Sequence, residues 1–201
     1  MVAVALREID HHDSGVTSGE VPDTTVDVVD ADPAWPLVFA EERRRLAHAL
    51  PGVVGIEHIG STSVPGLGSK PTIDILVVVG SADLAAAVPV LQALGYLHVP
   101  ESFADDPDHA FLHRLRAGKR THHLHLVSAS SPLPDRYLLF RDYLRAHPAA
   151  AARYEAVKRE LAARYPTDRD RYVEEKPVVV VELLTEATRW AGCGGSARPT
   201  G

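Results

Sequence analysis

The stretch from Thr72 to Val79, which reads TIDILVVV, constrains the fold of this chain more than any other segment. It is apolar almost throughout, and a strand that is buried on both faces of a sheet has this composition. Helices must therefore cover the sheet on both sides. Asp74 is the one charge inside the strand. A carboxylate is costly there unless it is paired or binds a cation, so Asp74 is the first candidate for a functional residue.

The other segments add strands and then helices. Apolar and β-branched runs predict strands over the ranges 25–29, 53–59, 96–100, 110–115 and 121–127. The sequence predicts a helix that is capped by Asp32, with Pro33 in its first turn, and further helices over 83–94, 135–146 and 148–165. Residues 178–181 are β-branched, which favours a strand, whereas the spacing of Val179, Leu183 and Ala187 favours a helix. Together these predict an α/β (α+β) fold, with a mixed β-sheet flanked by helices and a C-terminal helical part.

Charge is spread unevenly along the chain. The sequence has a net charge of −6, but residues 1–32 hold eight acidic residues and one basic residue, so the remainder is close to neutral. The first 25 residues also lack sustained periodicity. We expect a flexible acidic N-terminal arm over 1–25, one domain over 26–190 and a disordered tail over 191–201.

Composition also limits the compartment and the partners. No apolar run approaches the ~20 residues of a membrane helix, and the N-terminus lacks the pattern of a secretory signal. Cys193 is the single cysteine, which excludes an intrachain disulfide and favours a reducing compartment. We therefore expect a cytoplasmic protein that contacts no membrane. Net acidity argues against polymeric nucleic acid as a partner, although a basic run lies between residues 110 and 145.

A loop rich in glycine and hydroxyl groups precedes the buried strand. Glycine lets backbone N–H groups approach a ligand, and hydroxyl groups add donors, a combination that suits phosphate oxygens. The residues that we expect to bind phosphate here are Gly60, Ser61, Thr62, Ser63 and Lys70. The alternative is a loop that only turns the chain, with Asp74 bonded to backbone amides.

The loop and strand read IEHIGSTSVPGLGSKPTIDILV, and this stretch resembles the GrpB-like (UPF0157) family of the nucleotidyltransferase-fold superfamily. Further matching segments are DPAWPLVF, RTHHLHLV, LLFRDYLRAHP and YVEEK, so the resemblance extends over about residues 26–190. It implies a nucleotidyltransferase-like core. Some members of the family stand alone, and others are fused to dephospho-CoA kinase.

The superfamily pattern implies a specific site. It places Gly-Ser on a loop, Asp on the next strand with a second carboxylate two residues later, and a third carboxylate on a later strand. These acids hold two Mg²⁺ ions, which bind a triphosphate and activate the attacking hydroxyl. Gly60, Ser61 and Asp74 match this pattern. The second position is Leu76, and the third falls in 123–125, where histidine stands in place of a carboxylate. Three possibilities remain for the site: one metal ion, a different metal, or acid/base chemistry by histidine.

The sequence THHLH from residue 121 supplies the histidines. Alternate side chains of a strand share a face, so His123 and His125 point together. With Asp74 on a neighbouring strand they form a candidate site for a divalent metal, either Mg²⁺ or a transition metal. Alternatively, one histidine is a general base for a substrate hydroxyl or amine, or the histidines only bond within the sheet. The candidate catalytic residues and metal ligands are therefore Asp74, His123 and His125.

Basic side chains form a second candidate set. Arg141 and Arg145 are spaced i,i+4 and share a helix face, and Arg120 lies just before the histidines. Guanidinium groups suit phosphate oxygens, so we expect these three arginines to bind the anionic part of a ligand. The alternative is a solvated face with salt bridges. That alternative is stronger for Lys158, which alternates with glutamates.

The leading hypothesis is a nucleotidyltransferase-like enzyme. It binds ATP, another nucleotide or a phosphorylated small molecule, and it transfers a nucleotidyl group to, or activates, a small-molecule acceptor. Three alternatives remain: an ATP-dependent ligase that forms an amide or ester, a non-catalytic nucleotide-binding protein, and a metal-dependent hydrolase that uses Asp74 and the histidines. Leu76, in place of the second carboxylate, is the main support for the non-catalytic alternative.

Overall fold

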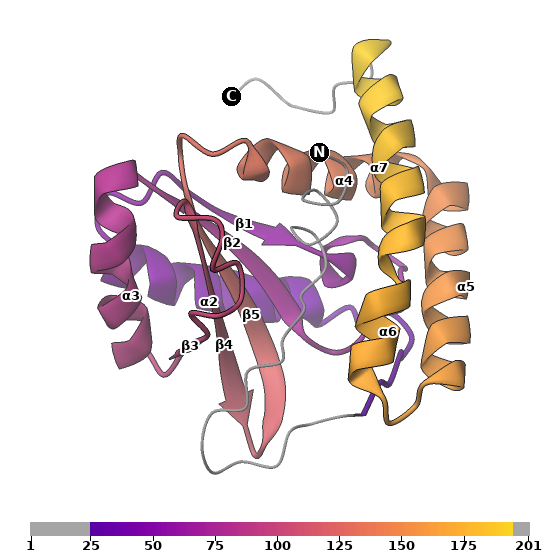
Figure 1. The fold of residues 1–201 in the computed structure, drawn as a ribbon, viewed down its shortest axis with the longest axis horizontal. Coiled ribbons are helices and arrows are strands. Elements are labelled where there is room, and N and C mark those ends of the chain that lie inside the picture. Colours follow the sequence, from indigo (N-terminus) through magenta and orange to yellow (C-terminus); the bar gives the residue numbers. More distant parts are fainter. Residues whose placement is uncertain (1–24, 195–201) are drawn as a thin grey trace.

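The computed structural model describes residues 25–194, which form a five-stranded sheet with helices packed around it (Figure 1). The strands are β1 (Gly55–Ile59), β2 (Ile73–Val79), β3 (Leu97–His98), β4 (His109–Arg116) and β5 (Lys119–Ser128). Their order across the sheet is β1-β2-β5-β4-β3. Strands β2 and β5 are parallel and the other neighbouring pairs are antiparallel, so the sheet is mixed, as the sequence predicted.

Helices cover both faces of the sheet. One face packs against α2 (Trp35–Ala49) and α3 (Leu84–Ala93). The other packs against α4 (Leu133–Ala146), which in turn contacts α5 (Pro148–Arg164) and α7 (Pro177–Gly192), with the short α6 (Arg169–Glu175) between them in the chain. Two short 3₁₀ helices, η1 (Ser61–Ser63) and η2 (Ser81–Asp83), follow β1 and β2. The predicted α/β class and the C-terminal helical part are confirmed.

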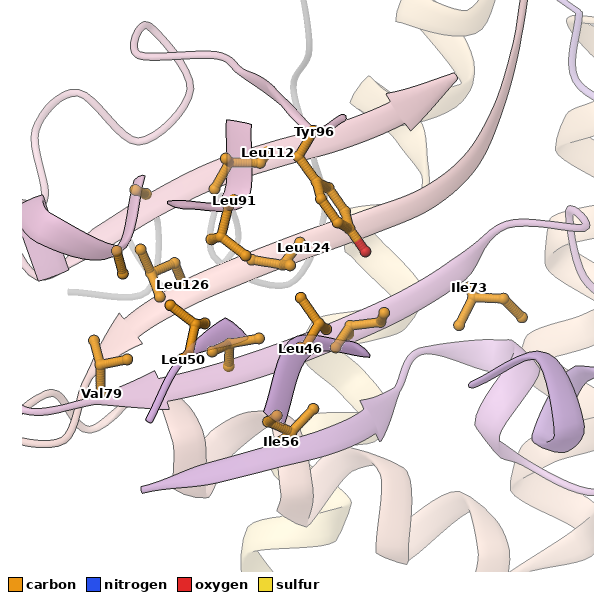
Figure 2. Packing of buried hydrophobic residues seen from close by; sticks show 14 of the residues in the cluster. Leu46, Leu50, Ile56, Ile73, Val79, Leu91, Tyr96, Leu112, Leu124 and Leu126 are labelled. Carbon is orange, nitrogen blue, oxygen red and sulfur yellow. The ribbon is translucent and has the colours of Figure 1, made fainter. Parts of the chain in front are cut away.

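The face covered by α2 and α3 holds the main hydrophobic core (Figure 2). Odd-numbered residues of β2, such as Ile73 and Val79, point to this side. They pack with Leu124 of β5, Leu46 of α2 and Leu91 of α3, and these three leucines are completely buried. Each such side chain stabilises the fold by about 1.5–3 kcal/mol through its removal from water.

Even-numbered residues of β2 point to the opposite face. Leu76 and Val78 pack there against Leu133 and Tyr137 of α4. Asp74 lies on the same face, one strand repeat before Leu76, where this apolar cluster ends. The period of two in a strand therefore places the single charge of β2 on the side of α4 to α7.

Some predicted boundaries differ from the structure. The strand expected over 25–29 is only one bridge between Val29 and Ser69. Asp32 does not cap α2, which begins at Trp35, because the Asp32 carboxylate accepts a hydrogen bond from the Ala34 N–H (2.8 Å) ahead of the helix. Residues 178–181 are helical within α7, because Val179, Leu183 and Ala187 are then buried together on one side of the helix.

The predicted terminal segments lie mostly outside the described residues. The arm expected over 1–25 has only Thr25 inside them. Helix α7 continues to Gly192, so the first two residues of the tail expected over 191–201 are helical, and residues 195–201 lie outside the description. Over the range 25–194, none of the helices has the length and apolar character needed to cross a bilayer.

Candidate functional site

The sheet register brings Asp74 to the junction between β1 and the loop that follows it. Asp74 pairs with Ile59, the last residue of β1, on one side and with His123 of β5 on the other. Gly60 comes next after Ile59, with φ +67° and ψ −174°, a conformation that is essentially restricted to glycine. A Cβ at Gly60 would clash with the Asp74 carboxylate and lie 2.8 Å from its Cγ. The glycine therefore allows the backbone to pass directly beside this carboxylate.

The hydroxyl groups of the loop have separate partners. The Ser63 hydroxyl donates to the Gly60 carbonyl (2.6 Å), and the Thr62 hydroxyl lies 2.9 Å from His58 Nε2. Both bonds stabilise the turn η1. Ser61 differs, because its hydroxyl accepts from the Lys158 ammonium (2.9 Å) and lines a pocket. Of the predicted phosphate-binding residues, Gly60, Ser61 and Lys70 line this pocket, whereas Thr62 and Ser63 do not.

Asp74 and His123 form a hydrogen-bonded pair. His123 Nδ1 lies 3.0 Å from Asp74 Oδ1, and the two side chains are 5% and 22% exposed. Burial lowers the pKa of His123 well below its usual value, and the nearby cations Arg169 and Lys70 lower it further. Burial raises the pKa of Asp74 to about 6, against the opposing effect of Lys70. At neutral pH the pair is therefore a neutral imidazole that donates its Nδ1–H to a carboxylate.

His125 belongs to a different set of contacts. It is completely buried, and its Nδ1 lies 2.9 Å from both His109 Nε2 and the Tyr137 hydroxyl. His125 is opposite Leu76 in the sheet, one strand repeat away from Asp74. Within the described residues, no group of three or more His, Cys, Asp or Glu side chains is placed to hold a metal ion. The predicted set of Asp74, His123 and His125 is not assembled as a ligand cluster, and metal binding stays a prediction.

The pocket over Asp74 is strongly cationic. It has a volume of about 70 Å³ and lies between the sheet, the β1–β2 loop and helices α5 and α6. Asp74 is the one acidic residue among those that line it. Four basic side chains line the same pocket, namely Lys70, Lys158, Arg169 and Lys176. A site with this imbalance of charge favours an anionic ligand.

Lys158 is the most unusual of these cations. It is only 3% exposed, and its ammonium donates to the Gly68 carbonyl (2.6 Å) and to the Ser61 hydroxyl, above the Tyr154 ring at 4.6 Å. Among the described residues, no carboxylate lies within 4.0 Å of its ammonium group. Burial lowers the pKa of Lys158 to about 7. Lysines are almost never buried without a charged partner, so Lys158 is a strong candidate for a ligand-binding residue.

Two further lysines approach Tyr172 of α6. The Lys70 and Lys176 ammonium groups lie 5.4 and 5.8 Å from the centre of the Tyr172 ring. Burial lowers the pKa of Lys176 to about 8, so it remains largely protonated at neutral pH. The negative face of the aromatic ring thus attracts two of the cations that line the pocket.

The predicted arginines take other positions. Arg145 donates two bonds to the Ser63 carbonyl (3.0 and 2.8 Å), and Arg141 bonds the His58 carbonyl (3.2 Å) and the Glu57 carboxylate (2.8 Å). The carbonyl of Arg120 accepts from the Thr72 hydroxyl (3.2 Å). None of these three arginines is among the residues that line the pocket. Arg141 and Arg145 instead hold the strand end and the loop in place.

Sequence reasoning favoured a solvated position for Lys158 and did not single out Arg169. The interpretation of Lys158 as a surface residue is wrong, although a signal for its burial was present. Tyr154, Lys158 and Leu161 follow one another at helical spacing, and all three are buried on one side of α5. The apolar stripe therefore indicates the buried position of Lys158 better than the neighbouring glutamates indicate an exposed one. Arg169 had no comparable signal, because its position depends on the turn before α6.

Comparison with known proteins supports the resemblance noted in the sequence. The family model described as GrpB protein matches residues 25–186. UPF0157 protein PA4798 of Pseudomonas aeruginosa is 43% identical over 82% of this chain and 69% of its own length. UPF0157 protein YqkA of Bacillus subtilis is 34% identical, and the chain spans 49% of it. The crystal structure of GrpB from Enterococcus faecalis matches with a TM-score of 0.75 at 33% identity, over 83% of this chain and 99% of that one.

Proposed function

We propose, from the premise that this chain belongs to the GrpB family, that it is a nucleotidyltransferase-like enzyme whose pocket binds phosphate groups. The ligand is ATP, another nucleotide or a phosphorylated small molecule. One observation carries the proposal: Lys70, Lys158, Arg169 and Lys176 converge on a pocket that contains a single carboxylate. Lysine and arginine side chains are the usual partners of phosphate oxygens in proteins.

The residues suggest distinct roles in the reaction. Ser61 and the four cations bind and orient the phosphate groups and offset the negative charge that develops during transfer. Asp74 is the general base that takes a proton from the hydroxyl or amine of a small-molecule acceptor. Its pKa of about 6 keeps it ionised at neutral pH and close to the optimum for proton transfer. His123 donates to Asp74 and fixes the orientation of the carboxylate.

The two-metal site of the nucleotidyltransferase superfamily does not fit these residues. Leu76 stands where the second carboxylate is expected, and it is completely buried in an apolar cluster with Ile59 and Val78. Mg²⁺ prefers several oxygen ligands in octahedral geometry, whereas Asp74 is the one carboxylate of the pocket. The proposed steps therefore use only side chains of the protein.

A non-catalytic nucleotide-binding protein is the second candidate. The burial of Leu76 favours it, because a site that has lost a metal ligand can retain the phosphate-binding cations. For either candidate we propose small-molecule partners and a cytoplasmic location. The single cysteine of the sequence supports that location.

Calorimetry and a turnover assay test the proposal. We expect ATP or inorganic pyrophosphate to bind the wild-type protein, and we expect pyrophosphate release from ATP with at least one of a set of alcohol and amine acceptors. Asp74→Asn should retain binding and lose turnover at least a hundredfold, the usual contribution of a general base. Asp105→Asn changes an exposed carboxylate and is the matched control.

The outcomes separate the two candidates. Binding without turnover for any acceptor supports the non-catalytic protein. Full turnover in Asp74→Asn removes this residue from the mechanism. If neither ATP nor pyrophosphate binds, the phosphate-binding function itself is wrong.

A further inference from the structure

We infer that the lysines of the pocket take the place of the two Mg²⁺ ions of the superfamily pattern, so that the site binds a small phosphate-bearing anion without any divalent cation. The ligand is a molecule that ends in a phosphate group, such as a phosphate monoester, a diphosphate or the triphosphate of a nucleotide, with its terminal phosphate among Lys158, Lys176 and Ser61. This inference rests on the proposed phosphate-binding function and names how that function is achieved.

The first argument is the burial of Lys158. Its ammonium bonds only neutral oxygen atoms, those of Gly68 and Ser61, and no carboxylate within 4.0 Å in the described chain balances its charge. The carboxylates of Glu155 and Asp74 act on it only from beyond this distance, and a buried cation that no carboxylate contacts directly is unfavourable. An anion in the pocket, next to the Ser61 hydroxyl, places a negative charge beside the Lys158 ammonium. It thereby lowers the free-energy cost of burying that ammonium.

The second argument is the direction from which the cations come. Lys70 ends the β1–β2 loop, Lys158 lies in the middle of α5, and Arg169 and Lys176 lie at the two ends of α6. The cations therefore surround the cavity from three elements that are separate in the sequence. Such an arrangement matches the several oxygen atoms of a tetrahedral phosphate, and a divalent cation at the same place would be repelled by all four side chains.

The third argument is the lack of suitable metal ligands. Asp74 is bonded to His123 on one side and packed against Gly60 on the other. His125, the nearest further candidate, has its Nδ1 within hydrogen-bonding distance of both His109 and Tyr137. In the range 25–194, no trio of His, Cys, Asp or Glu forms a ligand set. The side chains that could bind a metal are therefore bonded to other residues or dispersed, whereas four basic side chains line the same pocket.

The size of the cavity limits which part of the ligand is enclosed. Its volume of about 70 Å³ corresponds to roughly two water molecules. A phosphate group has five heavy atoms and fits this space, whereas a nucleoside does not. The remainder of the ligand must extend out of the cavity, so the enclosed part recognises the phosphate and the outer part sets the choice of molecule.

Calorimetric titration with inorganic pyrophosphate, once with EDTA and once with excess MgCl₂, tests the inference on the wild-type protein. We expect binding in EDTA that is at least as tight as binding with Mg²⁺. Lys158→Met and Lys176→Met should each weaken binding in EDTA at least tenfold, because each removes a charged hydrogen-bond donor. Lys119→Met changes an exposed lysine of the β4–β5 hairpin and should leave the affinity within about twofold.

Each other outcome contradicts the inference in a recognisable way. Binding that requires Mg²⁺ overturns it and leaves the phosphate-binding function intact. Binding in EDTA that both lysine variants retain places the pyrophosphate outside this pocket and also overturns it. A lack of binding in both buffers removes the proposed function as well. Thermal unfolding of each variant shows that a loss of affinity does not come from a loss of fold.

Discussion

The two faces of the sheet differ in how completely they are packed. The face under α2 and α3 carries one continuous apolar core, to which β2 and β5 contribute alternate residues such as Ile75 and Leu126. The face under α4 to α7 has three smaller apolar clusters, and the cationic pocket lies where they do not meet. The same strand, β2, supplies Ile75 to the first face and Asp74 to the second.

This contrast indicates that one face of the sheet mainly stabilises the protein, whereas the other carries the candidate site. The continuous core stabilises the sheet, and a well-stabilised sheet tolerates unfavourable groups on its other side. The buried Lys158 and the glycine-only geometry at Gly60 both lie on that other side. Stability and binding should therefore respond to different substitutions, and the following predictions test this in order of decreasing effect.

The largest effect is expected in the continuous core. Leu124→Ala removes a completely buried side chain of β5 and should lower the free energy of unfolding by about 3 kcal/mol. For a chain of this length the melting temperature should fall by about 9 °C in a thermal unfolding experiment. Pyrophosphate affinity of the folded variant should stay within about twofold. A large loss of affinity at unchanged stability would contradict the division between the faces.

The fold was predictable because its signals are local. The alternation of Leu124 and Leu126 and the apolar run of β2 show strands directly in the sequence. Ala117 and Gly118, both with positive φ, form the hairpin turn between β4 and β5. The boundary of α2 was less predictable, because the Asp32 side chain bonds ahead of the helix rather than capping its first turn.

The site was only half predictable, for a physical reason. Asp74, Gly60 and Ser61 form one motif in the sequence, and neighbouring strands bring His123 beside them. The cations Lys158 and Arg169 come from helices far along the chain, and only tertiary packing places them in the pocket. Charge patterns along a helix indicate which residues are basic but do not indicate which of them face a neighbouring element.

A pair of glycines in one loop gives the second prediction. Gly60→Ala forces a Cβ against Asp74 and also imposes strain at positive φ, so we expect a loss of about 2 kcal/mol in stability and at least tenfold in pyrophosphate affinity. Gly66→Ala has similar strain, with φ +77° and open space around the Cβ. It should cost about 1 kcal/mol and retain binding. Equal affinities for the two variants would show that the position of Asp74 does not matter for the pocket.

The smallest effect is expected to have the opposite sign. Lys158→Met replaces a buried ammonium by an apolar side chain of similar length. It should raise the free energy of unfolding by about 1 kcal/mol at pH 6, even though it weakens binding. Higher stability together with weaker binding is the expected result for a residue that serves binding rather than stability. A fall in stability of the same size would mean that the bonds from Lys158 to Gly68 and Ser61 contribute more than the burial of its charge costs.

The dependence on pH checks the cause of this gain. Lys158 has a pKa of about 7 in the folded protein and an ordinary value of 10.5. The unfolded chain therefore binds more protons between these two values, so the folded wild-type protein gains stability as the pH rises through this window. The charged groups around Lys158 are Glu155, Asp74, Lys70 and Arg159. Lys176 of the same pocket has a pKa of about 8, so it titrates inside this window, and its titration is present in both the wild-type protein and the variant. The advantage of Lys158→Met should thus be largest below pH 7 and shrink toward pH 10, and an advantage that does not change with pH would exclude the buried charge as its origin.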